Sequence, residues 1–339
     1  MNPEDAYSRA GVSQGAADAA VAALLESLRR IDPGRPSREV LGPGHYASVI
    51  QLDDSTGIAL CTDGVGTKLL VAEQLGRWET VGVDCVAMNV NDLVCVGAEP
   101  LAMLDYLAVP AADPDVIREL GRGLRHGAEL AGIEIPGGEL AQIGEIVRGL
   151  DLVGACFGRV ELAALVTGSR IRPDDAVIGL PSSGLHSNGF TLARRALEGI
   201  PMQDERLGAP LGELLLEPTR IYVRAVLDLL RSPVDVRGLA HITSGGLGNL
   251  LRLDAQVGYE IDDPLPVPPI FELIRERGSV PDDEMREVFN MGCGFCCVVS
   301  AGDTDSALAL LRGHDRGAKR IGRVTAQTGR LRTSPGHPR

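Results

Sequence analysis

The stretch Ile58-Ala-Leu-Cys-Thr-Asp-Gly-Val-Gly-Thr-Lys-Leu-Leu-Val-Ala-Glu-Gln-Leu75 passes from an apolar, strand-like run, through two glycines, into a helix-like segment. A strand, a glycine-rich turn and a helix in this order indicate layered α/β structure. The glycines allow backbone N–H groups to approach a bound phosphate. Lys68 closes the turn and is one of only two lysines in the chain. Because lysine is a compact point charge, we predict that Lys68 contacts a phosphate. The alternative is a plain turn with a solvated lysine.

The rest of the chain alternates strand-like with helix-like segments, which predicts an α/β or α+β fold in two domains. A length of 339 residues suits two domains of ordinary size, with a boundary near 165–172. Strands are predicted at 46–52, 58–62, 101–109, 150–160, 176–180, 258–261, 294–300 and 318–324. Helices are predicted at 16–30, 67–75, 80–96, 115–130, 189–197, 218–230 and 246–253, with a Pro-Gly-Gly turn at 136–138.

The composition excludes several classes of protein. A formal net charge of −13 argues against a nucleic-acid-binding surface. No apolar run reaches the ~18 residues of a membrane span, and the first residues lack the pattern of a signal peptide. We therefore predict a soluble, cytoplasmic protein with reduced cysteines. Cys293-Gly-Phe-Cys296 has the spacing of half a zinc or redox site, but no second pair completes it, so we interpret it as part of a buried strand.

The segment 83–95 is apolar on all sides apart from a few acidic and amide residues, which predicts a buried helix. A carboxylate in such a helix is costly unless it is paired, hydrogen-bonded or bound to a cation. Asp92 of this helix and Asp63 of the glycine-rich turn would make a carboxylate pair for Mg²⁺, which takes one or two carboxylates plus phosphate oxygens in nucleotide sites. The alternative for each aspartate is a helix cap or a buried salt bridge.

Three further loops carry polar groups beside glycines. Gly137-Gly138-Glu139 offers a third carboxylate, although this tripeptide is also common in plain turns. The loop 182–189 presents hydroxyls, an imidazole and an amide at the start of a predicted helix, which fits an anion or substrate site or simply a helix cap. His241 opens a second loop of this kind, His-Ile-Thr-Ser-Gly-Gly. Each loop alone is a weak signal, and together they indicate a site.

These motifs together resemble the aminoimidazole ribonucleotide synthetase family, also called phosphoribosylformylglycinamidine cyclo-ligases. The resemblance spans roughly residues 6–325, and Gly44-His-Tyr-Ala47 is similar to the archaeal-type version. The segments that carry it, in the family's order, are TDGVGTK (62–68), VAMNVNDLVCVGAEPLAMLDYLAV (86–109), PSSGLHSNGF (181–190), HITSGG (241–246) and FNMGCGF (289–295).

The resemblance implies a two-domain α/β (α+β) fold and a homodimer in which N-terminal strands form a barrel at the interface. Residues 1–168 would be the ATP-binding and dimerisation domain, residues 169–325 a C-terminal α/β domain, and residues 326–339 a disordered tail. The implied reaction is ATP-dependent closure of the imidazole ring of formylglycinamidine ribonucleotide in purine synthesis. ATP phosphorylates the formyl oxygen, the neighbouring amidine nitrogen attacks the carbon, and phosphate departs. Positioning and charge neutralisation dominate such a reaction.

The resemblance also implies roles for individual residues and names ATP, Mg²⁺ and optionally K⁺ as cofactors. Mg²⁺ would be held by Asp63, Asp92 and Glu139. ATP would be bound by Gly64, Gly66, Thr67 and Lys68, supported by Asp84 and Asn89. The substrate would be held by His186, Ser187, Asn188 and His241. The catalytic set would be Lys68, Asp92 and His186, with His186 as the proton-transfer group because imidazole titrates near neutral pH.

Two departures from the family pattern bear on the ligand pocket. The family has Thr and Pro where this chain has Leu140 and Gly144. Near the start of the chain, the segment Ala10-Gly-Val-Ser13 stands where the family usually has an Asp. These departures leave open a superfamily paralogue that acts on a related substrate, such as a selenophosphate or thiamine-phosphate enzyme. Such paralogues usually have Asp at the position of His241, which favours the cyclo-ligase. A non-catalytic nucleotide-binding scaffold is the third alternative.

Overall fold

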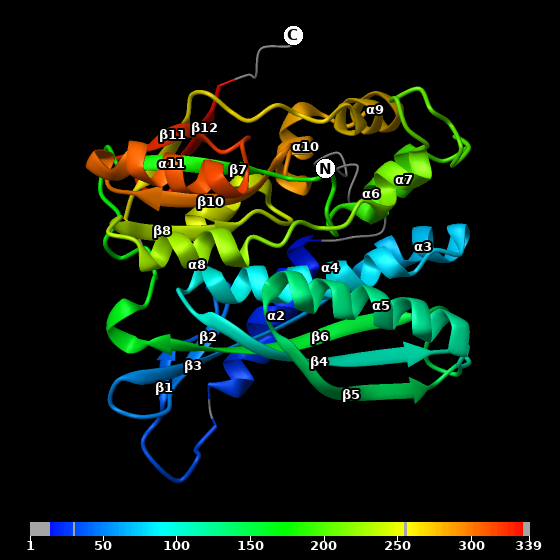
Figure 1. The fold of residues 1–339 in the computed structure, drawn as a ribbon, viewed down its shortest axis with the longest axis horizontal. Helices are drawn as coiled ribbons and strands as arrows, with labels where there is room; N and C mark the ends of the chain where they lie inside the picture. Colours follow the sequence, from blue (N-terminus) through cyan, green and yellow to red (C-terminus); the bar gives the residue numbers. More distant parts are fainter. Residues whose placement is uncertain (1–13, 30, 254–255, 335–339) are drawn as a thin grey trace.

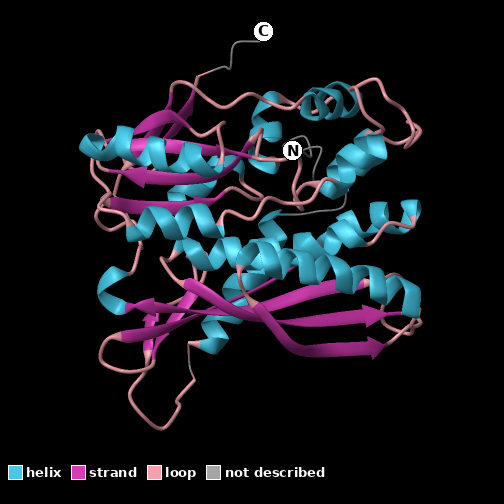
Figure 2. Ribbon diagram, viewed as in Figure 1, coloured by secondary structure: helices cyan, strands magenta, loops and turns pink. Residues whose placement is uncertain are grey.

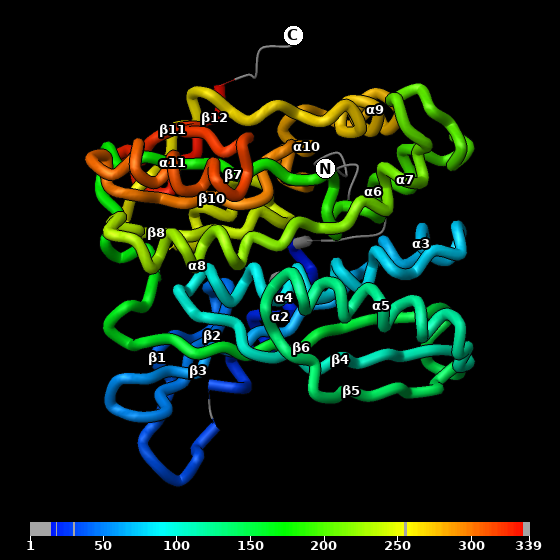
Figure 3. Tube along the Cα trace, viewed as in Figure 1, coloured from blue at the N-terminus to red at the C-terminus, as the bar shows by residue number. Residues whose placement is uncertain are grey.

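A computed structural model describes residues 14–29, 31–253 and 256–334, which form two mixed six-stranded sheets stacked with helices between them (Figure 1). The first sheet contains strands from the N-terminal half of the chain, and the second contains strands from the C-terminal half. Figure 3 follows the chain as it leaves β6 of the lower sheet and enters β7 of the upper sheet. The predicted mixture of helices and strands is confirmed.

The N-terminal sheet has the strand order β1-β2-β3-β6-β4-β5 and is antiparallel except for the parallel pair β4/β5. Helices α4 and α5 pack on one face of this sheet (Figure 2), and we call the opposite face, on which neither of them lies, the helix-free face. The described sheet is open and is not closed into a barrel within the chain. The bounds are β1 (Glu39–Leu41), β2 (Ser48–Gln51), β3 (Thr56–Gly64), β4 (Glu99–Val109), β5 (Glu134–Gln142), β6 (Asp151–Glu161), α4 (Glu79–Cys95) and α5 (Pro114–Ala131).

The C-terminal sheet has the order β12-β9-β11-β7-β10-β8, antiparallel except for the parallel pair β12/β9. Its strand β10, which lies between β7 and the edge strand β8, reads Cys-Gly-Phe-Cys-Cys-Val-Val and is buried throughout, as expected of a strand covered on both faces. The strands are β7 (Ala176–Pro181), β8 (Val236–His241), β9 (Gly258–Ile261), β10 (Cys293–Val299), β11 (Lys319–Thr325) and β12 (Leu331–Thr333). The helices are α6 (Phe190–Ala196), α7 (Leu211–Leu216), α8 (Val223–Arg231), α9 (Pro269–Gly278), α10 (Asp282–Val288) and α11 (Thr304–His314).

Helix α4 lies between the two domains. It contacts β3 and β6 of its own sheet on one side and β8 and α8 of the C-terminal domain on the other. Burial on both sides explains why its sequence lacks the polar stripe of a surface helix. Any polar residue on α4 therefore faces a domain and must find a partner there.

Several predicted elements differ from the observed ones. The Pro-Gly-Gly turn at 136–138 lies inside β5, because parallel pairing with β4 extends the chain there. The predicted helix 246–253 is the 3₁₀ helix η3 (Gly246–Arg252). The stretch from 326, predicted to be disordered, contains β12, which pairs with β9. The remaining segments are α2 (Gln14–Leu28), α3 (Leu69–Leu75), η1 (Gly66–Lys68), η2 (Leu162–Ala164) and η4 (Ala301–Asp303), while residues 10–13 lie outside the described residues.

Candidate functional site

The predicted aspartates meet where the end of β3, helix α4 and the end of β8 come together, which we call the inter-domain junction. Asn89 of α4 fixes the end of β3: its Oδ1 accepts from the backbone N–H of Asp63 at 3.0 Å, and its Nδ2 donates to the Asp63 carbonyl at 3.1 Å. The same Nδ2 also donates to the Cys85 carbonyl at 2.9 Å. Because the Asn89 amide is fully used and buried, the predicted direct contact with ATP is not what the structure shows. Asn89 positions Asp63 instead.

Asp63 and Asp92 form a pair of mutually repelling carboxylates. Burial raises the pKa of Asp63 to about 6, and the nearby Asp92 carboxylate acts in the same direction. A cation between the two carboxylates would offset their repulsion and the cost of burying their charge. Within the described residues, no three His, Cys, Asp or Glu side chains form a metal-binding cluster. Two carboxylates that leave the remaining positions to phosphate oxygens fit Mg²⁺ rather than a metal held in a protein cage.

His241 orients Asp92. Its Nδ1 lies 2.8 Å from Asp92 Oδ1, and its ring is fully buried. Its Nε2 lies 3.4 Å from the Nδ2 of Asn91, whose Oδ1 accepts from the backbone N–H of Tyr222 at 2.9 Å. The ring is buried against Asp92, so contact of His241 with substrate stays a prediction. His241 acts through Asp92.

Asp105 of β4 belongs to the same face of the sheet, and the sequence analysis missed it. Residues Asp63, Gly154, Asp105 and Gly138 lie opposite one another on four neighbouring strands, so their side-chain positions share one face. A Cβ added at Gly138 would lie 2.4 Å from Asp105 Oδ1, so glycine is required beside this carboxylate. Burial raises the pKa of Asp105. The signal that could have identified it is that Asp105 is the only charged residue in the otherwise apolar strand segment 101–109.

Glu139 occupies the next position on β5 and therefore points to the opposite face of the sheet, where it is exposed. It pairs in register with Tyr106, whose side chain lies on the helix-free face. Within one chain Glu139 cannot join Asp63 and Asp92 around a metal ion. The separation arises because a shift of one residue along a strand reverses the face, and a role of Glu139 in metal binding stays a prediction.

The glycine-rich turn leaves two of its predicted phosphate contacts accessible. Gly66 has φ +69°, which favours glycine, and both Gly66 and Thr67 are exposed. The Thr67 hydroxyl lies 3.0 Å from that of Thr191 at the start of α6, so the turn rests on the C-terminal domain. The backbone N–H of Gly64 donates to Asp63 Oδ1 at 2.7 Å. Phosphate binding by Gly64, Gly66 and Thr67 stays a prediction.

Lys68 has a different environment from the one predicted. Its ammonium forms a fully buried ion pair with Asp84 Oδ2 at 2.7 Å and donates to the carbonyls of Glu217 at 2.7 Å and His186 at 3.0 Å. An ammonium has three N–H donors, and these acceptors use all of them. The other oxygen of Asp84 accepts from the backbone N–H and the hydroxyl of Thr219, both at 2.7 Å. The ion pair lies within the N-terminal domain, and its hydrogen bonds to His186, Glu217 and Thr219 reach the C-terminal domain. Direct contacts of Lys68 and Asp84 with ATP stay a prediction.

His186 is a buried histidine with a left-handed backbone, φ +63°. Its Nε2 accepts from the backbone N–H of Ser183 at 3.2 Å. Burial lowers the pKa of His186 well below its usual range, and nearby His241 and Lys68 act in the same direction. The ring is therefore buried and its Nε2 is already used as an acceptor, which is not the accessible imidazole that we expected. Proton transfer by His186 stays a prediction.

The two residues after His186 are held by other polar side chains. The Ser187 hydroxyl is buried and lies 3.0 Å from that of Thr219. Asn188 is half-buried, and its Oδ1 accepts from the Ser244 hydroxyl at 3.0 Å. Of the substrate residues predicted in loop 182–189, Asn188 is the one whose side chain remains partly accessible.

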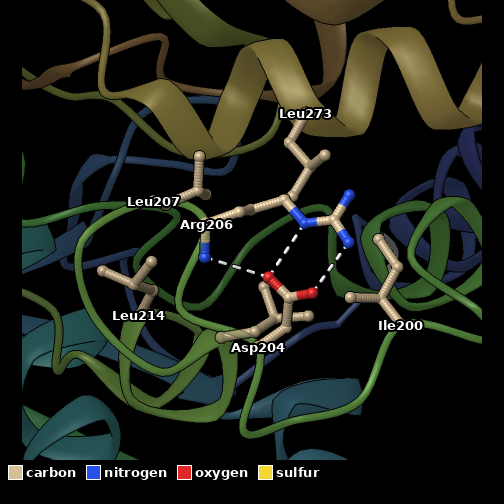
Figure 4. Close-up of a pocket in the computed structure, with 7 residues that line it drawn as sticks. Ile200, Asp204, Arg206, Leu207, Leu214 and Leu273 are labelled. Carbon is tan, nitrogen blue, oxygen red and sulfur yellow. Dashed lines mark hydrogen bonds and ion pairs between the residues drawn. The ribbon is translucent and has the colours of Figure 1, made fainter.

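A small hollow elsewhere in the C-terminal domain has no features of a site. Figure 4 shows it between α9 and the loop before α7, lined by leucines, with Arg206 donating to both oxygens of Asp204 at 2.7 and 2.8 Å. The enclosed space does not accommodate a water molecule. The Asp204–Arg206 pair is a local loop contact and not part of the inter-domain junction.

Two family models match the chain. One is the AIR synthase related protein N-terminal domain, over residues 44–160, and the other is the AIR synthase related protein C-terminal domain, over residues 172–333. The chain belongs to the AIR synthase related family. The described part of the chain contains no helix with the length and apolarity needed to cross a membrane.

Relatives in this family match almost the whole chain. A protein of Methanothermobacter thermautotrophicus named phosphoribosylformylglycinamidine cyclo-ligase is 49% identical over 326 residues, which is 94% of each chain. A protein of the same name from Thermococcus gammatolerans is 50% identical over 305 residues, 89% of this chain and 88% of that one. Thiamine-monophosphate kinase from Stenotrophomonas maltophilia has a similar fold, with a TM-score of 0.59 at 22% identity over 88% of this chain and 92% of that chain.

Proposed function

We infer that this protein is a phosphoribosylformylglycinamidine cyclo-ligase, which closes an imidazole ring at the expense of ATP. The observation that carries this conclusion is the 49% identity to a relative of that name over 94% of both chains. The reaction joins the amidine nitrogen to the formyl carbon of formylglycinamidine ribonucleotide, and the formyl oxygen leaves as phosphate. The products are aminoimidazole ribonucleotide, ADP and phosphate. We keep the prediction that this reaction takes place in the cytoplasm.

We propose that Asp63 and Asp92 hold Mg²⁺ together with ATP phosphate oxygens, and that Asp105 assists from the same face of the sheet. The mutual repulsion of Asp63 and Asp92 supports this assignment. Bound Mg²⁺ would neutralise the charge on the transferred phosphoryl group. The exposed backbone of Gly66 and the hydroxyl of Thr67 would bind phosphate oxygens. A requirement for K⁺ remains a prediction from the family resemblance.

His241 and Asn188 take separate roles in this proposal. His241 is a positioning residue, because its Nδ1 contacts Asp92 Oδ1 at 2.8 Å and its ring is buried. Asn188 would contact the substrate, because it is half-buried and bridges the loops that begin at Ser182 and His241. Lys68 and Asp84 would act as positioning residues in this proposal, because they bond to the loops at His186 and at residues 217–219 and hold them against the N-terminal domain.

Two measurements test the assigned reaction. The chain should restore growth without purines to an auxotroph that lacks this step, and the purified protein should convert formylglycinamidine ribonucleotide and ATP to aminoimidazole ribonucleotide and ADP. Failure of both, with ATP turnover on another substrate, would replace this conclusion with the superfamily paralogue. Binding of ATP without turnover of any substrate would leave the non-catalytic scaffold.

We also propose that the protein is a homodimer that buries the helix-free face of the N-terminal sheet. Four apolar residues on this face are each 39–44% exposed, namely Ile50, Leu60, Leu104 and Tyr106. Monomeric proteins rarely expose a contiguous apolar patch over a whole sheet face. A second copy packed against this face would turn the open sheet into part of a barrel, as the family resemblance implies, and would place Glu139 beside the partner.

Substituting Leu104 by Glu should weaken the dimer by about 100-fold or more in Kd, because the twofold axis brings two unpaired charges into an apolar interface. Sedimentation velocity would measure the effect. Val267→Glu is the matched control, because Val267 is an apolar residue of similar exposure, 46%, in the C-terminal domain. An unchanged dimer in Leu104→Glu, or a monomeric wild-type protein, would refute this interface.

Leu140 departs from the family pattern but should have little effect on ATP use. Leu140 is 41% exposed and pairs with Leu107 of β4. A threonine hydroxyl at this position could therefore hydrogen-bond to water as well as to a phosphate. Leu140→Thr is expected to change the KM for ATP by less than about tenfold, the range of one ordinary hydrogen bond. Steady-state kinetics would check this. The prediction would be contradicted if the wild-type protein did not close the ring and the Leu140→Thr protein did.

A further inference from the structure

The loop at residues 42–47 reaches from the N-terminal domain onto η3 of the C-terminal domain. Tyr46, only 6% exposed, donates its hydroxyl to the Asn249 carbonyl at 2.9 Å. Arg252, the last residue of η3, places the central carbon of its guanidinium 5.7 Å from the centre of the Tyr46 ring. This distance is that of a cation–π contact, which holds a guanidinium in place while leaving its N–H edge free.

Among the described residues no carboxylate forms a salt bridge with Arg252, whereas Arg170, Arg220 and Arg237 each form an ion pair with an aspartate. Other arginines of the C-terminal domain, such as Arg224 and Arg330, also form no such ion pair within the described structure. Arg252 is set apart by its place: it is exposed, and its guanidinium lies against the Tyr46 ring.

The position of Arg252 relates it to the inter-domain junction. The helix η3 continues the loop that begins at His241, and its Asn249 side chain accepts from the backbone N–H of Thr243 at 2.8 Å and donates to the Ser244 carbonyl at 3.0 Å. The Ser244 hydroxyl in turn donates to Asn188 at 3.0 Å, so the short helix that ends at Arg252 is anchored to the junction. An anionic ligand near two carboxylates is repelled, and an arginine on the other side of the ligand offsets that repulsion.

We propose that Arg252, braced on Tyr46, binds a phosphate group of a ligand at the inter-domain junction. The planar guanidinium offers two parallel N–H donors, which match two oxygens of a phosphate. This assignment rests on the proposed function, because the two ligands of the ring-closing reaction each carry phosphate that Arg252 could bind. One is the ribose 5-phosphate of the substrate, and the other is the triphosphate of ATP.

The test compares wild-type protein with Arg252→Gln by calorimetric titration, using ribose 5-phosphate and the magnesium complex of a non-hydrolysable ATP analogue as separate probes. Loss of one charged, bidentate contact should raise the Kd of one probe by about ten- to a hundredfold. Weaker binding of ribose 5-phosphate alone assigns the contact to the substrate, and weaker binding of the analogue alone assigns it to ATP. Arg330→Gln is the matched control, because Arg330 is an arginine beside β12 at the far edge of the C-terminal sheet.

Tyr46 provides a second pair of variants. Tyr46→Phe keeps the aromatic face and should bind the affected probe like the wild type, whereas Tyr46→Leu removes the face and should weaken binding in the same direction as Arg252→Gln. Equal binding of both probes by wild type and Arg252→Gln, or binding of neither probe by the wild type, would overturn the proposal. A failure of ring closure in the wild-type protein would instead count against the proposed function, since these titrations need no turnover.

Discussion

Replacing Lys68 with Met should lower the free energy of unfolding by about 3–5 kcal/mol, the cost of leaving a buried charge without its partner. The methionine has a similar length but no charge, so the buried Asp84 carboxylate would keep only its two hydrogen bonds from Thr219. The carbonyls of His186 and Glu217 would also lose a donor. Denaturant unfolding of the purified variant measures the change.

The only other lysine of the chain supplies the matched control. Lys319 pairs with Asp263 at 2.6 Å, but its side chain is 30% exposed and that of Asp263 is 67% exposed. Exposed ion pairs contribute about 0–1 kcal/mol, so Lys319→Met should have little effect on stability. Equal effects of the two substitutions would show that the buried Lys68 and its bonds to both domains add no more to stability than an exposed ion pair.

Lys68→Arg distinguishes a structural role from direct phosphate binding. A guanidinium is too wide for a site whose three acceptors surround one nitrogen, so the charge-conserving change should still destabilise the protein. Turnover by the Lys68→Arg protein should fall because less of the protein is folded, and it should recover in part at lower temperature. A Lys68→Arg protein of normal stability but with a greatly raised KM for ATP would restore the direct phosphate contact predicted from the sequence.

Asp92→Asn should lower kcat by at least about 100-fold, the usual cost of removing one preorganised charge from an active site. The amide keeps the size of the carboxylate but loses the negative charge that Mg²⁺ requires. It also presents the wrong group to His241 Nδ1, which now lies 2.8 Å from a carboxylate oxygen. Activity measured against Mg²⁺ concentration should show a much higher metal requirement.

The stability of Asp92→Asn distinguishes a metal-binding role of Asp92 from a structural role. The Asp92 side chain is 19% exposed, so removing its charge should change the melting temperature by only a few degrees. Asp262→Asn, which alters an exposed partner of Arg320, controls for a general effect of lost charge. A large fall in melting temperature with an unchanged Mg²⁺ requirement would make Asp92 a structural partner of His241 and not a metal ligand.

Local sequence was sufficient for much of the architecture. The apolar run with helical spacing at 80–96 became the buried helix α4, and the strand before the glycine-rich turn became β3. These elements are determined by periodicity and turn chemistry, which act over a few residues. The pairing of Asp63 with Asp92 was expected from their residue types, but α3 separates the glycine-rich turn from α4, and it is the packing of α4 against β3 that brings the two aspartates together. The pattern of Gly, Asp and His motifs was specific enough to indicate the family.

The partners of the charged residues were decided by the tertiary structure. Lys68 looks like a phosphate ligand next to two glycines, but loops more than 100 residues away bury it against Asp84. His186 has the chemistry of a proton carrier, but burial keeps it neutral. Glu139 was on the wrong face because the register of β5 against β4 is not encoded locally. Sequence motifs determine which groups are available, whereas desolvation and long-range packing determine which of them remain free to bind a ligand.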